Sequence, residues 1–146
     1  MSYAAAAELR QRIGGSVFNE IYGISAGSDL SGKSEIADDL ESASAEIDGA
    51  IASRYALPVT GSRSLVLLKD WNLTLAEERA YTRPAGGIFT EKIKLRVGQV
   101  RKYLDMIRAD EFKLPDAEEN TSASGTAIAL IRRDDPIFDR EKMEGF

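Results

Sequence analysis

The chain has 146 residues, of which 43% are hydrophobic, and its formal net charge is -5. This length and apolar content fit one compact domain and leave little room for a second independent core. The sequence contains no cysteine and no histidine, which excludes disulfides, thiol and imidazole catalysis, and zinc or haem bound through either residue type.

The sequence shows no membrane or export signal. No apolar run approaches the roughly 18 residues that a membrane-spanning helix needs. The N-terminus also lacks a basic region followed by an apolar stretch. We therefore expect a soluble protein that is made in the cytoplasm. Its acidic balance argues against a protein that binds nucleic acid by neutralising phosphates.

Charge is distributed unevenly along the chain. Residues 1–60 carry 4 basic and 9 acidic side chains, residues 61–114 carry 11 and 7, and residues 115–146 carry 4 and 8. The sequence favours pairing of the basic middle with the acidic ends inside one molecule. Pairing across subunits stays open, because complementary charge there fixes partner and register.

The first third of the chain predicts three helical segments. Strong helix formers over residues 4–13 predict a short helix that ends at Gly14 and Gly15. Residues 16–32 predict one or two helical turns followed by a glycine-rich loop. From Ser34, which can cap a helix, apolar or small side chains recur every three or four residues, as on one buried helix face. These positions are Ile36, Leu40, Ala43, Ile47 and Ile51.

The stretch Arg54-Tyr55-Ala56-Leu57-Pro58 ends this helix. Pro58 cannot continue a helix, and it disfavours helical angles at Leu57. We expect Tyr55 and Leu57 to fold back over the end of the core, with Arg54 near the negative end of the helix. The sequence favours Tyr55 as a lid on the core; a contact of Arg54 and Tyr55 with another subunit is the alternative.

Two further helices follow. Residues 62–83 predict a helix whose first turns are apolar nearly all round, as in the most buried helix of a bundle. Residues 90–111 predict the clearest helical stripe of the chain. Its apolar positions are Ile93, Val97, Val100, Leu104 and Ile107. The other faces are basic and carry Lys92, Lys94, Arg96, Arg101, Lys102 and Arg108.

The C-terminal part is less regular. Residues 115–126 are polar and rich in turn formers, which indicates a linker. A short apolar run at residues 127–131 follows, and then four separate apolar side chains that need a packing surface: Ile137, Phe138, Met143 and Phe146. The sequence therefore predicts an all-α fold, a compact bundle of about four to five helices over residues 1–114, with a linker and an extended C-terminal arm over residues 115–146.

Several groups of residues invite a ligand interpretation that their spacing does not favour. Asp38 and Asp39 offer carboxylates that calcium or magnesium prefers, as do Asp134, Asp135 and Asp139, but no calcium-binding loop surrounds them. The glycine pairs lack phosphate-loop spacing. No nucleophile stands near a recognisable base. We expect no catalytic, metal or cofactor site.

The basic face from Lys92 to Lys102 lacks an aromatic stacking platform and a recognisable DNA-reading helix. This favours a solvated face or an acidic subunit partner, with at most weak non-specific contact with DNA.

Residues 44–59, SAEIDGAIASRYALPV, and the closing DPIFDREKMEGF resemble a family of small virion proteins encoded in the head-morphogenesis region of phage Mu and Mu-like prophages. The residues that carry the resemblance are Ser44, Ala45, Glu46, Ile47, Asp48, Gly49, Arg54, Tyr55, Leu57, Pro58, Asp135, Phe138, Gly145 and Phe146. The resemblance is good over residues 36–83 and 134–146, weak over 4–13, and one of pattern over 90–112. Residues 115–126 depart from it, because they are longer and more polar. In helical layout the family is similar to the head-tail connector, or adaptor, proteins of tailed phages.

The resemblance implies a non-enzymatic virion structural protein, made in the bacterial host cytoplasm, that forms a homo-oligomeric ring at the DNA exit channel. Portal and tail-completion proteins are the implied partners, and no membrane is involved. A ring needs two different patches on each subunit. The residues assigned to that contact are Asp38, Asp39, Glu46, Arg54, Tyr55, Lys92, Lys94, Arg101 and Lys102. The arm residues Ile137, Phe138, Met143 and Phe146 are assigned to docking on an adjacent subunit, the portal or a tail protein.

The alternative function is a small helical regulatory or nucleic-acid-associated protein that uses the Lys92–Lys102 face. An enzyme that works through carboxylates is a third interpretation.

Overall fold

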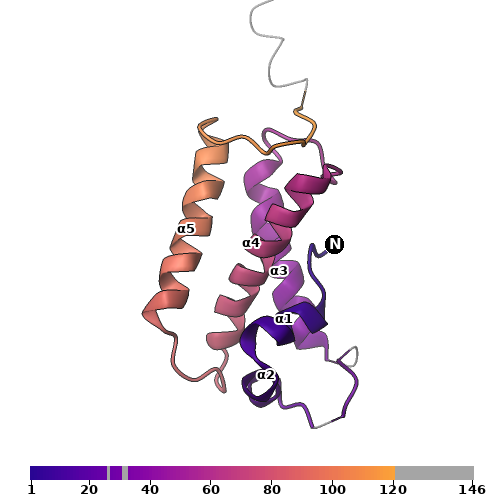
Figure 1. The fold of residues 1–146 in the computed structure, drawn as a ribbon, viewed down its shortest axis with the longest axis vertical. Helices are drawn as coiled ribbons and strands as arrows, with labels where there is room; N and C mark the ends of the chain where they lie inside the picture. Colours follow the sequence, from indigo (N-terminus) through magenta and orange to yellow (C-terminus); the bar gives the residue numbers. More distant parts are fainter. Residues whose placement is uncertain (26, 31–32, 121–146) are drawn as a thin grey trace, which may run out of the picture.

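A computed structural model describes residues 1–25, 27–30 and 33–120. Within these ranges the chain forms five α-helices, and its β-structure is one isolated bridge between Tyr55 and Glu119. The helices are α1 (Ala6–Ile13), α2 (Gly15–Tyr22), α3 (Ser34–Ile51), α4 (Ser62–Tyr81) and α5 (Glu91–Arg108). The prediction of an all-α bundle of about four to five helices is confirmed (Figure 1).

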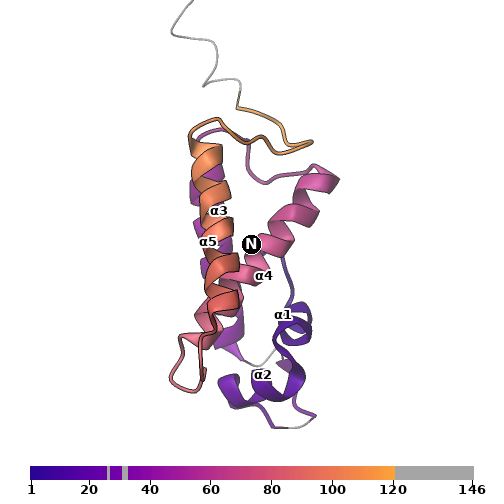
Figure 2. The same ribbon diagram turned by 60° about the vertical axis from the view of Figure 1, so that its left-hand side comes forward.

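The three long helices form the body of the molecule, and α1 and α2 pack at one end of it (Figures 1 and 2). Helix α3 contacts both α4 and α5. The first turns of α4 lean away from α3 and α5 (Figure 2). Because α4 diverges at its start, its beginning is less covered than its middle.

Both predicted helical stripes form the centre of the core. Every apolar position of the two stripes on α3 and α5 is buried. Small residues of α3, among them Ala43, Ser44 and Ala50, are also buried and let the neighbouring helices approach closely. Full burial of one large apolar side chain stabilises the fold by roughly 1.5–3 kcal/mol, so these stripes supply much of the driving force for the bundle.

Gly14 separates the two short helices. Its φ of 100° lies in the region that favours glycine. Its N–H donates to the carbonyl of Arg10 at the end of α1, and its carbonyl accepts from Phe18 in α2, both at 2.9 Å. Phe18 is buried, and its ring lies 4.8 Å from that of Tyr22. One glycine therefore ends α1 and directs the aromatic side chains of α2 into the core.

Two expectations about helix starts are wrong. Ser34 does not cap α3; it is the first helical residue, and Lys33 precedes it without a side-chain cap. The first turns of α4 are not the most buried part of the bundle, because Leu65 and Val66 are 36% and 69% exposed. Most of the buried residues of α4 lie from Leu68 onward, and they include Trp71, Asn72 and Leu75.

Residues 115–120 are held against the helices. The N–H of Ala56 donates to the carbonyl of Glu118 at 2.9 Å, and the N–H of Asn120 donates to that of Arg54 at 2.8 Å. The side-chain amide of Asn120 donates to the carbonyls of Ala52 and Tyr55. The linker interpretation missed these contacts, because polar side chains here bind backbone groups that the turn leaves open.

Asp116 completes the start of α4. Its carboxylate accepts the backbone N–H groups of Arg63 and Ser64 at 2.9 and 2.8 Å. These hydrogen bonds hold the pKa of Asp116 below its usual range. A Cβ on Gly61 would lie 2.2 Å from an Asp116 carboxylate oxygen, so a glycine is needed for this approach. A residue 52 positions away from Ser64 thus satisfies the helix start that lacks its own cap.

We predict that Asp116→Ala lowers the urea midpoint of unfolding at neutral pH. Because the folded pKa is depressed, the stabilisation is present above the unfolded pKa of about 3.9 and is lost as the pH falls through the folded value. Urea titrations of both proteins at neutral and strongly acidic pH should show a difference that disappears in acid. Asp116→Asn, which keeps one acceptor oxygen, should lose less. A difference that does not depend on pH would contradict the charge-assisted cap.

Candidate functional site

The turn from Arg54 to Pro58 joins α3 to α4 and is centred on Tyr55. Tyr55 is only 3% exposed, and its hydroxyl accepts the buried N–H of Leu114 at 3.0 Å. Arg54 lies on the surface, with its guanidinium 3.7 Å from the carboxylate of Asp110. The geometry fits the interpretation of Tyr55 as a lid on the core. The expectation for Leu57 is wrong, because 42% of its surface is exposed.

We predict that Tyr55→Phe destabilises the fold by about 1–3 kcal/mol, because the N–H of Leu114 is left buried without an acceptor. Urea denaturation measures the change. Tyr103→Phe is the matched control, since no hydrogen bond of its hydroxyl occurs among the described residues and its ring stacks on Trp71. Equal losses in the two variants would show that the Leu114 hydrogen bond contributes nothing specific.

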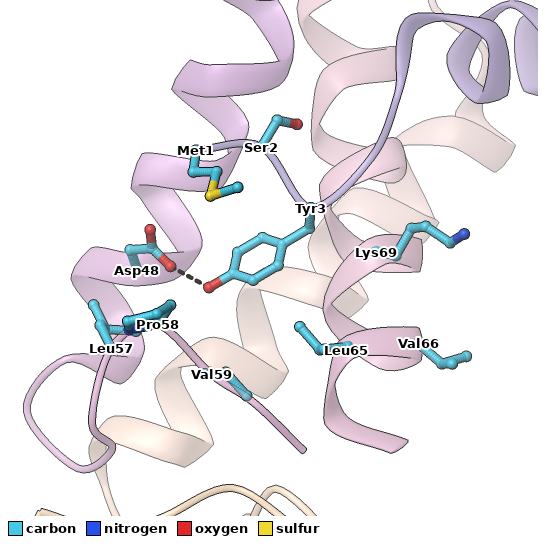
Figure 3. A pocket seen from close by; sticks show the side chains of 10 residues that line it. All are labelled: Met1, Ser2, Tyr3, Asp48, Leu57, Pro58, Val59, Leu65, Val66 and Lys69. Carbon is cyan, nitrogen blue, oxygen red and sulfur yellow. Dashed lines mark hydrogen bonds between the residues drawn. The ribbon is translucent and has the colours of Figure 1, made fainter. Parts of the chain in front are cut away.

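A pocket of about 750 Å³ lies beside this turn. Its walls come from the N-terminal segment, the end of α3 with the following turn, and the first turns of α4 (Figure 3). The lining residues are Met1, Ser2, Tyr3, Asp48, Leu57, Pro58, Val59, Leu65, Val66 and Lys69. Six of them are aliphatic, methionine or proline side chains, so the lining is mainly apolar.

The N-terminal segment is fixed as one wall of this pocket. The hydroxyl of Tyr3 reaches across it and donates to the Asp48 carboxylate (Figure 3). Burial, and then the neighbouring carboxylate, raises the pKa of Tyr3, so its hydroxyl stays protonated. The hydroxyl of Ser44 donates to the carbonyl of Met1 at 2.9 Å. The segment is therefore tied to α3 at two points.

The charged side chains of the pocket lining, Asp48 and Lys69, are already bound to other side chains. Asp48 accepts from Tyr3, and the amine of Lys69 lies 2.6 Å from the carboxylate of Glu8 outside the lining. What remains open to a partner is the apolar surface of Leu57, Leu65 and Val66. Such a surface suits apolar side chains of a protein segment. In the described part of the chain, no group of three or more acidic, histidine or cysteine side chains is placed to hold a metal ion.

Two of the acidic residues predicted at a subunit contact pair inside the chain. The Asp39 carboxylate receives two hydrogen bonds from Arg83, at 2.8 and 2.9 Å, and one from the Tyr22 hydroxyl at 2.7 Å. Burial, and then the hydrogen bond to Asp39, raises the pKa of Tyr22. The same carboxylate also raises the pKa of Arg83. Glu46 pairs with Arg79 and Arg101, both at 2.9 Å.

The basic face of α5 is also largely paired. Arg101 contacts Glu46 on α3 and Glu78 on α4, and these two carboxylates raise its pKa. Lys94 lies 2.8 Å from Glu91, and Arg96 lies 3.0 Å from the buried Glu77. Of the predicted contact residues, the structure thus brings Glu46 and Arg101 together, and does so within one molecule.

Three predicted contact residues remain open. Asp38, Lys92 and Lys102 are exposed, and none has an ion pair among the described residues. Whether they meet a neighbouring subunit stays a prediction. The arm residues Ile137, Phe138, Met143 and Phe146 lie outside the described residues.

We predict that Arg101→Ala lowers the stability of the isolated chain, by about 1 kcal/mol, because it removes a partly exposed link between three helices. Lys102→Ala, at the next position, should stay within about 0.5 kcal/mol of the parent. Urea denaturation of the two variants side by side tests this. A larger loss of stability for Lys102→Ala than for Arg101→Ala would contradict the assignment of Arg101 as the cation that links the helices.

The apolar pocket was missed by the sequence analysis. Its N-terminal residues Met1 and Tyr3 carry no pattern that reveals it. A signal did exist at the start of α4, where Leu65, Val66, Leu67 and Leu68 supply more apolar surface than one helix face can bury. The sequence analysis interpreted this excess as the mark of the most buried helix, whereas in the structure part of it is exposed apolar surface.

None of the helices in the described ranges is long and apolar enough to cross a membrane. A family model described as "Bacteriophage Mu, Gp36" matches residues 3–131. The matched range contains all five helices, the Arg54–Pro58 turn and most of the pocket lining. No curated protein and no solved structure matches the chain.

Proposed function

The chain belongs to the Bacteriophage Mu Gp36 family, and from this premise we propose that it is a non-enzymatic structural protein of the virion, a subunit of the head-tail connector. The resemblance to Mu-like phage proteins is confirmed by the family match. The head-tail connector role is more specific than the family match and is our proposal. It places the chain in a ring at the DNA exit channel, with portal and tail-completion proteins as partners.

The observation that best supports this role is the outer face of α5. Lys92, Leu95, Gln99 and Lys102 follow one another at steps of three, four and three, and all are exposed. Leu95 is 74% exposed. This face therefore presents an apolar side chain between two lysines that have no ion pair among the described residues. A subunit interface commonly has this form, with apolar contact inside and charge at the rim.

A complementary surface lies on α3. Glu35, Asp38 and Glu41 are exposed in its first half and have no ion pair with any described residue. A ring forms when one patch of each subunit contacts a different patch of the next and the rotation closes. We place the acidic start of α3 against the basic face of α5 in the neighbouring subunit. Internal pairing of Asp39, Glu46 and Arg101 removes these three from the contact.

The acidic net charge of the chain also suits a connector. DNA must move through such a ring, and a surface of like charge does not hold phosphates. The alternative role in nucleic-acid binding has weaker support. Three of the five cations from Lys92 to Lys102 are engaged with carboxylates of the same chain.

Light scattering tests the proposal, first on the chain alone at high concentration and then mixed with the portal protein of the same phage. We predict a ring, or an assembly that requires the portal. Lys92→Glu with Lys102→Glu should reduce assembly at least about tenfold, since like charges then face each other, while the urea midpoint of the monomer stays unchanged. Arg10→Glu, another exposed cation without an ion pair among the described residues, is the matched control.

Charge exchange identifies the two surfaces. Asp38→Lys with Glu41→Lys should impair assembly alone and restore it when combined with the α5 reversal. Failure of the combination to restore assembly would overturn the assigned contact. A monomer that ignores the portal would overturn the connector role, and salt-dependent binding of DNA by that monomer would favour the alternative.

A further inference from the structure

The pocket beside the Arg54–Pro58 turn leaves an unusual amount of apolar surface uncovered. Leu57, Leu65 and Val66 line it and are all exposed. They come from two different segments of the chain, and Leu57 lies on the opposite side of the pocket from Leu65 and Val66 (Figure 3). Single exposed apolar residues are ordinary, but a hollow formed by several of them marks a site for another segment.

The described chain ends at Asn120, which is bound to the turn that supplies part of this pocket. Asn120 is fixed by its backbone N–H to the carbonyl of Arg54, and by its side-chain amide to those of Ala52 and Tyr55. Tyr55 stands two residues before Leu57, a lining residue. Two residues of chain span less than about 8 Å. The arm therefore starts close to the opening of the pocket.

The sequence beyond Asn120 contains a segment of suitable length and chemistry. Residues 121–126 are polar, and residues 127–131 read AIALI. Six extended residues reach up to about 20 Å, which is enough to bring this run from Asn120 into the pocket. The run carries Ile128, Leu130 and Ile131, and no charge that would need a partner in an apolar site. The family match also extends to residue 131 and so includes the run.

We propose that residues 127–131 occupy the pocket of their own chain. A short tether holds a segment at an effective concentration in the millimolar range, so the segment outcompetes a free partner of modest affinity. Binding within one chain also avoids the loss of translational and rotational freedom that a second molecule incurs. The occupant is thus this chain's own arm, in preference to a second copy or another virion protein.

This inference does not depend on the connector role. The docking that the resemblance implies for Ile137, Phe138, Met143 and Phe146 is a separate prediction.

Disulfide trapping in the full chain tests the proposal. Because the chain has no natural cysteine, only the two introduced cysteines can form a disulfide. Val66→Cys is combined with Ala129→Cys, which keeps every large apolar residue of the run. A disulfide needs Cα atoms within about 7 Å, so only a seated arm forms it readily. Leu95→Cys with Ala129→Cys is the control, because Leu95 is as exposed as Val66 and lies on α5. Far-UV circular dichroism checks that all variants remain folded.

We expect an intramolecular disulfide that forms at least about tenfold faster for the Val66 pair than for the Leu95 pair. Adding Ile128→Asp and Leu130→Asp should remove this preference, since the tether is unchanged but the run can no longer bury its side chains. Equal rates in the two pairs would overturn the proposal. A preference that survives the aspartates would also overturn it, because proximity alone then explains the rate. Disulfide-linked dimers would assign the pocket to a second copy's arm.

Discussion

The described structure depends on the hydrogen bonds that join the turn after α3 to residues 114–120. Helix α3 ends at Ile51, and backbone groups of residues 54–56, which lie beyond the helix, are bound by residues 118–120. Tyr55 covers the end of the core and accepts the N–H of Leu114. The same loop carries Asp116 to the start of α4. One turn therefore fixes the end of α3, the start of α4 and the loop after α5, and it forms a wall of the apolar pocket.

The charged side chains act mainly as links between helices. Asp39 joins α3 to Arg83, which follows α4, and Glu46 joins α3 to both α4 and α5 through Arg79 and Arg101. The nearly buried Glu77 is neutralised by Arg12 and Arg96. A carboxylate with so little solvent contact is destabilising unless cations and hydrogen bonds surround it. Most cations in the basic middle of the chain thus form ion pairs within the molecule. Few exposed cations there, such as Lys92 and Lys102, have no ion pair among the described residues.

The sequence predicted the helices well because their signal is local. The stripes on α3 and α5 depend on spacing alone, and Gly14 and Pro58 act on their own backbone. The pairing of Asp116 with α4, and of Asn120 with the turn, depends on residues far apart in sequence and carries no periodic signal. The same holds for the pocket, whose walls come from three segments. Charge balance favoured pairing within the chain but did not predict the partners, because the pairing of Glu46 with Arg79 and Arg101 depends on how α4 and α5 pack against α3.

Closure of the turn also sets an order of events while the chain is being made. Tyr55 and Asn120 are separated by 65 positions, and synthesis at about 5–20 residues per second leaves roughly 3–13 s between their emergence. During this interval α3 and the start of α4 exist without the loop that satisfies their ends. This end of the core is therefore closed only once residues 114–120, which follow the last helix, have left the ribosome.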